Sequence, residues 1–369
     1  MNAMYFVFIN ILIFLLSFLT LGNFPYGNKS GNKKFVWKTK YLLVVLFFFV
    51  IGATRPVVKD TDNDRYVELY QHVQIFSELP VYLKNTEVGY SALNMLFGAV
   101  FGLPYYIFFG VITALTWGIY VASSYRYQFL LPWMLFFTIS SGFLFWSFSG
   151  IRQSLAIMIF FYSIRFIIER KILYYIVTIA IASLFHSSVL LLLPLYFLSS
   201  IKFNRNFWLI TYITSIFFMS SSFISTAMNK TLTSFFQLLP YFQNYAQYTV
   251  SDSFLVSREE AATDTGLGII LNISVNLFIV FFSRETLTRF PILNLYFLLF
   301  SFGAVTSNIF FSVELIGRLL SYFLIPFGLL IAATIYSYDK KHRKIVFSIF
   351  FIVYTLLFLK QLFAIVSLQ

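Results

Sequence analysis

The chain has 369 residues, of which 59% are hydrophobic and only 11% are charged, and its mean hydropathy is +0.82. A soluble domain carries about 25% charged residues, whereas a membrane-spanning helix needs roughly 20 mostly apolar residues. The composition therefore excludes a string of soluble domains and predicts one all-α polytopic membrane domain over residues 1–369.

The net charge of +12 does not predict a nucleic-acid partner. Most lysines and arginines lie in short loops beside apolar segments, where positive charge orients membrane helices. The chain has no cysteine, which excludes disulfides and thiol catalysis. His72, His186 and His342 are far apart and match no metal-binding spacing, so we predict no metal site and no cofactor.

The apolar segments follow one another along almost the whole chain. The first, 3–21, lacks a basic start and a small-residue cleavage site, so we predict a retained helix rather than a signal peptide. The others lie at 39–54, 89–103, 104–122, 129–147, 152–168, 172–186, 187–200, 207–226, 266–283, 291–311, 316–336 and 345–363.

Basic clusters between these segments set the topology, since positively charged loops stay in the cytoplasm. They lie at Lys29–Lys40, Arg126, Arg165–Lys171, Lys202–Arg205, Arg284–Arg289 and Lys340–Lys344. This assignment makes 89–103, which contains Asn94, Gly98 and Gly102, a short re-entrant or interfacial helix. About twelve full spans then remain, with both termini outside.

The first long outer loop, 55–88, is rich in charge. Arg55 opens it, Asp60 and Asp62 form a D-x-D pattern, and Glu87 lies near its end. D-x-D is typical of metal-dependent nucleotide-sugar transferases, but alone it fits a solvated acidic loop equally well. We expect Arg55 and Glu87 to bind substrate, and either aspartate is a candidate general base.

The segment 148–154 enters a helix at the outer face, with Ser149 or Gly150 as its cap. Arg152 then lies in the first turn, where free N–H groups and the helix dipole favour an anion such as diphosphate. The alternative is an arginine whose guanidinium reaches the lipid headgroups. We predict that Arg152 binds an anionic group such as a phosphate and that its neighbour Gln153 contacts substrate.

His186 lies at the tip of a tight hairpin whose arms each hold about 15 apolar residues, or about 22 Å of helix. The hydrocarbon core is about 30 Å thick, so we expect His186 slightly below the outer surface. A lone histidine is more often structural, but this position and the usual imidazole pKa near 6.5 make it a candidate base.

The second long outer loop, 227–265, carries Tyr241 and Tyr245 near Pro240. These tyrosines fit sugar-binding residues beneath a lid, and they fit an interfacial aromatic belt equally well.

Glu314, Arg318 and Tyr322 follow at helical spacing and so share one helix face. One interpretation is an ion pair that eases membrane insertion. We favour contact of Arg318 with a ligand phosphate, with Glu314 orienting the arginine and Tyr322 adding a hydrogen bond; Glu314 is also a candidate base.

At these residues the chain resembles the Wzy-type polysaccharide polymerases, in particular their EpsG-like branch. The resemblance rests on motifs that cover about a quarter of the chain: RPVVKDTDNDRYVELY with EVGYSALN, SGIRQSLAIMIFFYSIRFIIERKILYYIVTIAIASLFHSSVLLLLPL, and ELIGRLLSYFLIPFGLLIA. It implies a GT-C-like glycosyltransferase, independent of metal, that faces the periplasm from a bacterial inner membrane.

The implied reaction joins repeat units carried on undecaprenyl diphosphate into O-antigen of lipopolysaccharide, capsule or exopolysaccharide. Donor and acceptor would both be lipid-linked, membrane lipids would surround the enzyme, and a separate co-polymerase would set chain length. Arg152 and Arg318 suit the negative charge that builds on the leaving diphosphate. The base stays open among four candidates, which are His186, Asp60, Asp62 and Glu314.

Two other functions fit a similar number of spans. A flippase for lipid-linked oligosaccharides needs cationic residues along a cavity reached from both faces, whereas the embedded charges here gather on the outer side. An O-antigen ligase uses the same donor with a different acceptor, and the sequence does not separate it from a polymerase.

Overall fold

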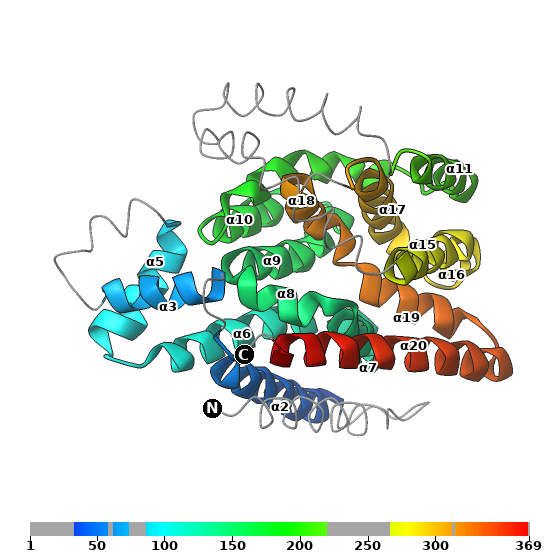
Figure 1. The fold of residues 1–369 in the computed structure, drawn as a ribbon. Helices are drawn as coiled ribbons and strands as arrows, with labels where there is room; N and C mark the ends of the chain where they lie inside the picture. The colour runs from blue at the N-terminus through cyan, green and yellow to red at the C-terminus, as the bar shows by residue number, and fades with distance from the viewer. Residues whose placement is uncertain (1–32, 58–61, 74–85, 220–265, 312–313, 368–369) are drawn as a thin grey trace. The chain divides into compact units, whose positions relative to one another are not determined.

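The computed structural model describes residues 33–57, 62–73, 86–219, 266–311 and 314–367 of the chain. Every regular element in these ranges is a helix (Figure 1). The chain divides into two compact units, one formed by Met1–Ser199 with Tyr338–Gln369 and the other by Ser200–Ser337. The prediction of an all-helical protein is confirmed for the described residues.

The first unit contains most of the helices. They are α2 (Lys33–Thr54), α3 (Asp62–Val73), α5 (Val88–Asn94), η2 (Met95–Val100), α6 (Tyr105–Ser123), η3 (Tyr125–Leu130), α7 (Leu131–Thr138), η4 (Ile139–Phe143), α8 (Leu144–Ser149), α9 (Ile151–Ile168), α10 (Ile172–Ser183), η5 (Ser187–Ser200) and α20 (Lys340–Ser367). Helix α6 packs against α2 and α9, and α9 packs against α10 (Figure 1).

The second unit contains fewer helices, which pack mainly around α17. They are α11 (Arg205–Ile216), α15 (Gly266–Phe281), α16 (Ser283–Arg289), η7 (Pro291–Leu293), α17 (Asn294–Ile309), α18 (Glu314–Leu324) and α19 (Phe327–Ser337). A buried hydrogen bond from Asn308 to Ser215, 2.9 Å long, ties α17 to α11.

Six helical stretches among the described residues are long and apolar enough to cross a membrane, and a seventh results if the bent pair α15–α16 is one span. The six coincide with the predicted segments 104–122, 129–147, 152–168, 291–311, 316–336 and 345–363, and the bent pair coincides with 266–283. Other predicted spans are shorter helices, such as α10 and η5, and segment 3–21 lies outside the described residues. The count of twelve spans stays a prediction.

The predicted short helix at 89–103 is present as α5 followed by the π-helix η2. The chain turns just after this helix at Gly102, whose φ of +61° is the left-handed conformation that glycine adopts without strain. A continuous apolar helix of 13 residues, Val88–Val100, is about 20 Å long and thus too short to span.

One predicted span, 129–147, is kinked in the structure. Helix α7 passes into the π-helix η4, where Gly142 has a φ of +97°, before α8 continues the chain. Helix α20 packs against this kink, and a Cβ on Gly142 would lie 3.1 Å from the side-chain Nε2 of Gln361. The positive φ favours glycine at this position.

Helices α2 and α6 approach each other closely at Gly52, and this contact predicts a test of packing. A Cβ at Gly52 would lie 2.4 Å from Oγ1 of Thr113 and 2.7 Å from the carbonyl oxygen of Phe109. We expect Gly52→Ala to destabilise the protein by about 1–3 kcal/mol, because the helices must move apart. Thermal unfolding in detergent measures the loss.

The matched control for this test is Gly266→Ala, at the start of α15, where a Cβ would meet no atom within 4 Å. This control should be neutral or slightly stabilising, since alanine favours helix over glycine. Equal melting temperatures for the two variants would contradict the close α2–α6 contact.

Candidate functional site

Three segments of the first unit bring charged side chains together. Glu87 is the N-cap of α5, Arg152 lies in the first turn of α9, and His186 follows the end of α10. The sequence separates Glu87 from Arg152 by 65 positions and from His186 by 99. The fold therefore builds a polar cluster from residues predicted independently, which we call the Glu87 cluster.

The backbone of α5 places Glu87 beside the α10 turn. The N–H of Gly89 donates to the carbonyl oxygen of Leu184 at 2.9 Å, and the N–H of Tyr90 approaches the same oxygen at 3.4 Å. A Cβ on Gly89 would lie 2.7 Å from Cβ of Leu184 and 2.8 Å from its carbonyl oxygen. Position 89 must therefore be glycine for the two segments to meet.

Glu87 connects the other two members through its two carboxylate oxygens. Nη1 of Arg152 donates to Oε2, and Nδ1 of His186 lies 3.1 Å from Oε1. The side chain of Arg152 is 25% exposed and those of Glu87 and His186 are 17% exposed. The cluster is thus partly shielded from solvent, where ionic hydrogen bonds are stronger than at a surface.

Burial raises the pKa of Glu87, but the hydrogen bond to His186 and the positive charge of Arg152 outweigh that effect. The net result is a pKa below the ordinary value of 4.5. Glu87 is therefore a carboxylate at neutral pH, and it is a hydrogen-bond acceptor for both neighbours.

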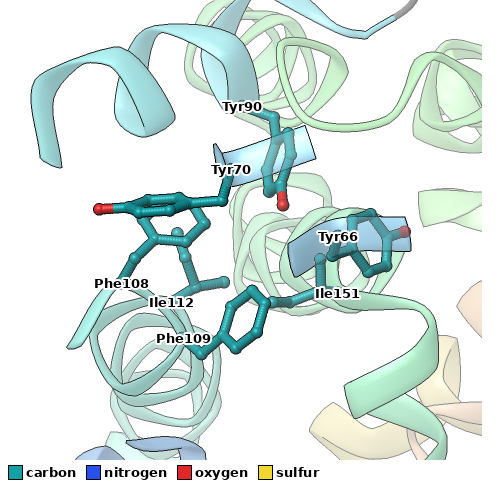
Figure 2. Packing of buried hydrophobic residues seen from close by; sticks show 7 residues of the cluster. All are labelled: Tyr66, Tyr70, Tyr90, Phe108, Phe109, Ile112 and Ile151. Carbon is teal, nitrogen blue, oxygen red and sulfur yellow. The ribbon is translucent and has the colours of Figure 1, made fainter. Parts of the chain in front are cut away.

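A mainly aromatic layer supports the Glu87 cluster. Its buried members are Tyr66, Tyr70, Tyr90, Phe108, Phe109, Ile112 and Ile151 (Figure 2), and Phe185 packs against them. Ile151 precedes Arg152 in the chain and Phe185 precedes His186, so packing of these neighbours positions the polar residues. The guanidinium carbon of Arg152 lies 5.7 Å from the ring centre of Tyr66 and 5.8 Å from that of Tyr90.

A second arginine, Arg55, is buried beside the same layer with only 6% exposure. Its guanidinium carbon lies 3.7 Å from the ring centre of Phe109, and Nη1 donates to the carbonyl oxygen of Phe148 at 3.4 Å. Nε and Nη2 meet no hydrogen-bond partner within the described part of the chain. The expected substrate contact of Arg55 stays a prediction, since stacking on Phe109 is itself a sufficient structural role.

The cluster retains groups that can act on a bound molecule. Nε of Arg152 is buried and has no hydrogen-bond partner among the residues described. Within those ranges the His186 side chain makes its hydrogen bond through Nδ1, to Glu87, which leaves Nε2 for a ligand. An arginine donor and an imidazole nitrogen suit an anionic leaving group and a hydroxyl nucleophile, respectively.

The aspartates of the predicted D-x-D pattern are not part of this cluster as far as the structure describes them. Asp62 opens α3, its side chain is 44% exposed, and it lies 3.8 Å from Arg65. An acidic residue in a first helical turn stabilises the helix dipole, which explains Asp62 without catalysis. Asp60, Tyr241 and Tyr245 lie outside the described residues.

The remaining predicted residues occupy other places. Gln153 is buried on α9 beside Arg152, at 6% exposure. Arg318 is exposed and Tyr322 completely buried on α18 of the second unit, and Glu314 is the first residue of that helix. The structure assigns these three to one helix, as predicted, and their expected roles stay predictions. Within the described ranges, no group of three or more His, Asp or Glu side chains could hold a metal ion.

From the sequence we expected Glu87 only to contact substrate. The sequence did not single out Gly89 or the two tyrosines beside Arg152, Tyr66 and Tyr90. The segment Glu87-Val88-Gly89-Tyr90 carried a usable signal, since a glycine at the start of a helix permits close backbone approach. The partner of that approach, Leu184, carries no comparable signal in the sequence.

A comparison with protein families matches the EpsG family over residues 38–367, which is nearly the whole chain. The chain therefore belongs to the EpsG family, whose members are Wzy-type polysaccharide polymerases. No curated protein and no solved structure matches the chain. The Glu87 cluster and its aromatic layer lie within the matched residues.

The close contact at Gly89 predicts that Gly89→Ala abolishes most activity. The added methyl group would push α5 away from Leu184 and separate Glu87 from His186. We expect at least a tenfold loss of polymer synthesis in membranes, with normal protein abundance. Gly266→Ala at the start of α15 is the control, because a Cβ there would meet no atom within 4 Å. Equal activity of both variants would contradict this description of the site.

The lowered pKa of Glu87 predicts an acid-dependent component of stability. Because the folded-state pKa lies below 4.5, the carboxylate contributes stability at neutral pH that is lost as the pH falls from about 4.5 through the lowered value. Glu87→Gln should lack this component. Melting temperatures between about pH 3 and 6 should therefore fall less steeply for Glu87→Gln than for the natural protein.

The control is Glu68→Gln on the exposed surface of α3, which should keep the natural pH dependence. A Glu87→Gln profile parallel to that of the natural protein would show that the carboxylate is not held by Arg152 and His186.

Proposed function

We propose that this protein joins oligosaccharide repeat units carried on undecaprenyl diphosphate into a longer polysaccharide, at the outer face of a bacterial inner membrane. The observation that carries the proposal is the Glu87 cluster, in which Arg152 and His186 meet within an apolar helical unit of a polysaccharide-polymerase family. Embedding charge in a membrane costs roughly 2.5–3.5 kcal/mol per residue at a helix centre, so such groups generally have a function.

The proposed reaction is a glycosyl transfer between two lipid-linked substrates. A sugar hydroxyl of the acceptor attacks the anomeric carbon at the reducing end of the donor chain. A new glycosidic C–O bond forms, the bond from that carbon to the diphosphate oxygen breaks, and undecaprenyl diphosphate leaves. The bond to diphosphate supplies the free energy, so no nucleotide sugar takes part.

Arg152 is suited to the leaving group in this reaction. Negative charge grows on the diphosphate as the bond breaks, and a fixed guanidinium stabilises it best where water is scarce. Nε of Arg152 is buried without a hydrogen-bond partner in the described ranges, which leaves it available for a phosphate oxygen. Arg55 and Arg318 remain further candidates for substrate phosphate, together with Tyr322.

His186 is the residue we assign as the general base among the four candidates. Glu87 occupies Nδ1, so Nε2 can take the proton from the attacking hydroxyl. Asp62 is paired with Arg65 at the exposed start of α3, which favours a structural role for it. Gln153 is close in sequence to Arg152 and remains a candidate for sugar binding.

The orientation follows from the distribution of charge along the chain. Arg126, Glu169 and Lys171 form an ion-pair group at the opposite end of α9 from Arg152. Helix α9 has 18 residues and is about 27 Å long, close to the thickness of the hydrocarbon core. If the basic group is cytoplasmic, Arg152 faces the periplasm. A periplasmic site also suits lipid-linked units and a co-polymerase that sets chain length.

Substitution of Arg152 tests the proposal. Vesicles containing the full-length protein receive lipid-linked repeat units extracted from cells in which its gene is deleted, and gels resolve the products. The natural protein should form a ladder and release undecaprenyl diphosphate. We expect Arg152→Ala to lower the rate about 10²–10³-fold, as for loss of an oxyanion donor. Arg126→Ala, on η3 and paired with Glu169 just after the far end of α9, is the matched control and should keep the ladder.

Other outcomes identify the alternatives. Movement of intact lipid-linked units across the vesicle membrane, without longer products, would indicate a flippase. Transfer onto a lipid A–core acceptor, without joining of repeats, would indicate a ligase. An intact ladder with stably folded Arg152→Ala would refute the role of Arg152.

A further inference from the structure

We infer that Glu87 is a positioning residue, which holds the ring of His186 so that Nε2 is presented to the attacking hydroxyl. The inference rests on the proposed function and deepens it. It replaces the expectation from the sequence that Glu87 itself binds substrate. Three features of the Glu87 cluster support it: the division of the carboxylate between two partners, the tautomer that results, and the rigidity of the backbone.

The carboxylate of Glu87 is held at both oxygens. Oε2 accepts from Nη1 of Arg152 and Oε1 accepts from Nδ1 of His186 at 3.1 Å. Two different partners on two oxygens fix the plane of the group as well as its position. A carboxylate that binds substrate directly would be expected to direct an oxygen toward the substrate, whereas here both oxygens are already engaged.

This contact determines which nitrogen of His186 carries the proton. An ionised carboxylate only accepts hydrogen bonds, and the lowered pKa of Glu87 keeps it ionised at neutral pH. In the neutral imidazole the proton therefore lies on Nδ1, and the lone pair lies on Nε2. A carboxylate behind a histidine sets the tautomer and ring orientation in many catalytic sites.

The backbone around this pair leaves little room for another arrangement. The carbonyl oxygen of Leu184 accepts from the N–H of Gly89, and the N–H of His186 donates to Ala182 at 3.1 Å. Phe185, between these residues, packs against the aromatic layer. Glu87 and His186 are thus connected through short stretches of backbone that are themselves anchored.

Three further charged or titratable residues lie around the Glu87–His186 pair. Arg152 of α9 contacts Glu87, and Tyr66 of α3 and Tyr90 of α5 lie against the guanidinium of Arg152. Arg152 neutralises the charge of Glu87 through Oε2, the carboxylate oxygen that His186 does not contact. When the imidazole becomes positively charged during proton transfer, the carboxylate is already oriented to stabilise it.

A double-mutant cycle tests the inference in the vesicle assay. Glu87→Gln keeps the shape of the side chain but offers an amide that no longer requires a proton on Nδ1. We expect this variant to lower kcat about 10²-fold with little change in KM, a typical size for impaired general-base catalysis. His186→Gln should cause a similar or larger loss. The double variant should be no slower than His186→Gln alone, because Glu87 acts through His186.

The opposite results overturn the inference. Independent, multiplicative losses in the double variant, or a Glu87→Gln effect confined to KM, would mean that Glu87 binds substrate. Normal kcat in folded His186→Gln would refute the base assignment while the polymerase proposal stands. Absence of polymer from the natural protein, with active lipid-linked substrate, would instead refute the proposed function.

Two further variants separate positioning from loss of folding. Glu87→Asp should recover part of the lost kcat, and failure to exceed Glu87→Gln would contradict the inference. If Glu87→Gln does not fold, the cycle is run with Glu87→Asp. The exposed Glu68→Gln is the matched control and should retain natural kinetics.

Discussion

The Glu87 cluster depends above all on one backbone contact, between Gly89 and Leu184. This contact sets how closely the short helix α5 approaches the α10 turn, and so whether Glu87 reaches His186. The contact requires glycine, because a Cβ would lie under 3 Å from the Leu184 backbone. The hydrogen bond from Gly89 to Leu184 and the absence of a side chain at position 89 thus determine where Glu87, Arg152 and His186 meet.

The ion pair between Glu87 and Arg152 explains how the largely apolar first unit accommodates their charges. Removal of one member of a partly buried ion pair leaves the other uncompensated, which generally costs more than the pair contributes. Glu87 compensates Arg152 and orients His186 at the same time, and the tyrosine rings of the aromatic layer face the guanidinium. The Glu87 cluster and the aromatic layer therefore depend on each other. Packing of the aromatic rings positions the backbone, and hydrogen bonds position the charged side chains.

The sequence predicted those parts of the fold that depend on local composition. Helices α6 and α9 follow from unbroken apolar runs, and the short α5–η2 helix follows from Gly98, Gly102 and Pro104. The kink at Gly142 was not predicted, because an isolated glycine is tolerated in many helices and the packing of α20 against it is a long-range contact. Arg152 and His186 stood out as charges beside apolar segments. Their common partner could not be identified, because contacts across 65 and 99 positions depend on tertiary packing. Family membership agrees with the resemblance carried by these motifs.

The most direct test of this account is an experimental structure of the full-length protein in lipid nanodiscs, with an undecaprenyl-diphosphate-linked repeat unit bound. The account predicts diphosphate density in contact with Arg152 and a sugar hydroxyl or water within hydrogen-bond distance of Nε2 of His186. It also predicts that Glu87 still contacts Nδ1 of His186. Diphosphate bound away from Arg152, or Glu87 in direct contact with the sugar and separated from His186, would contradict it.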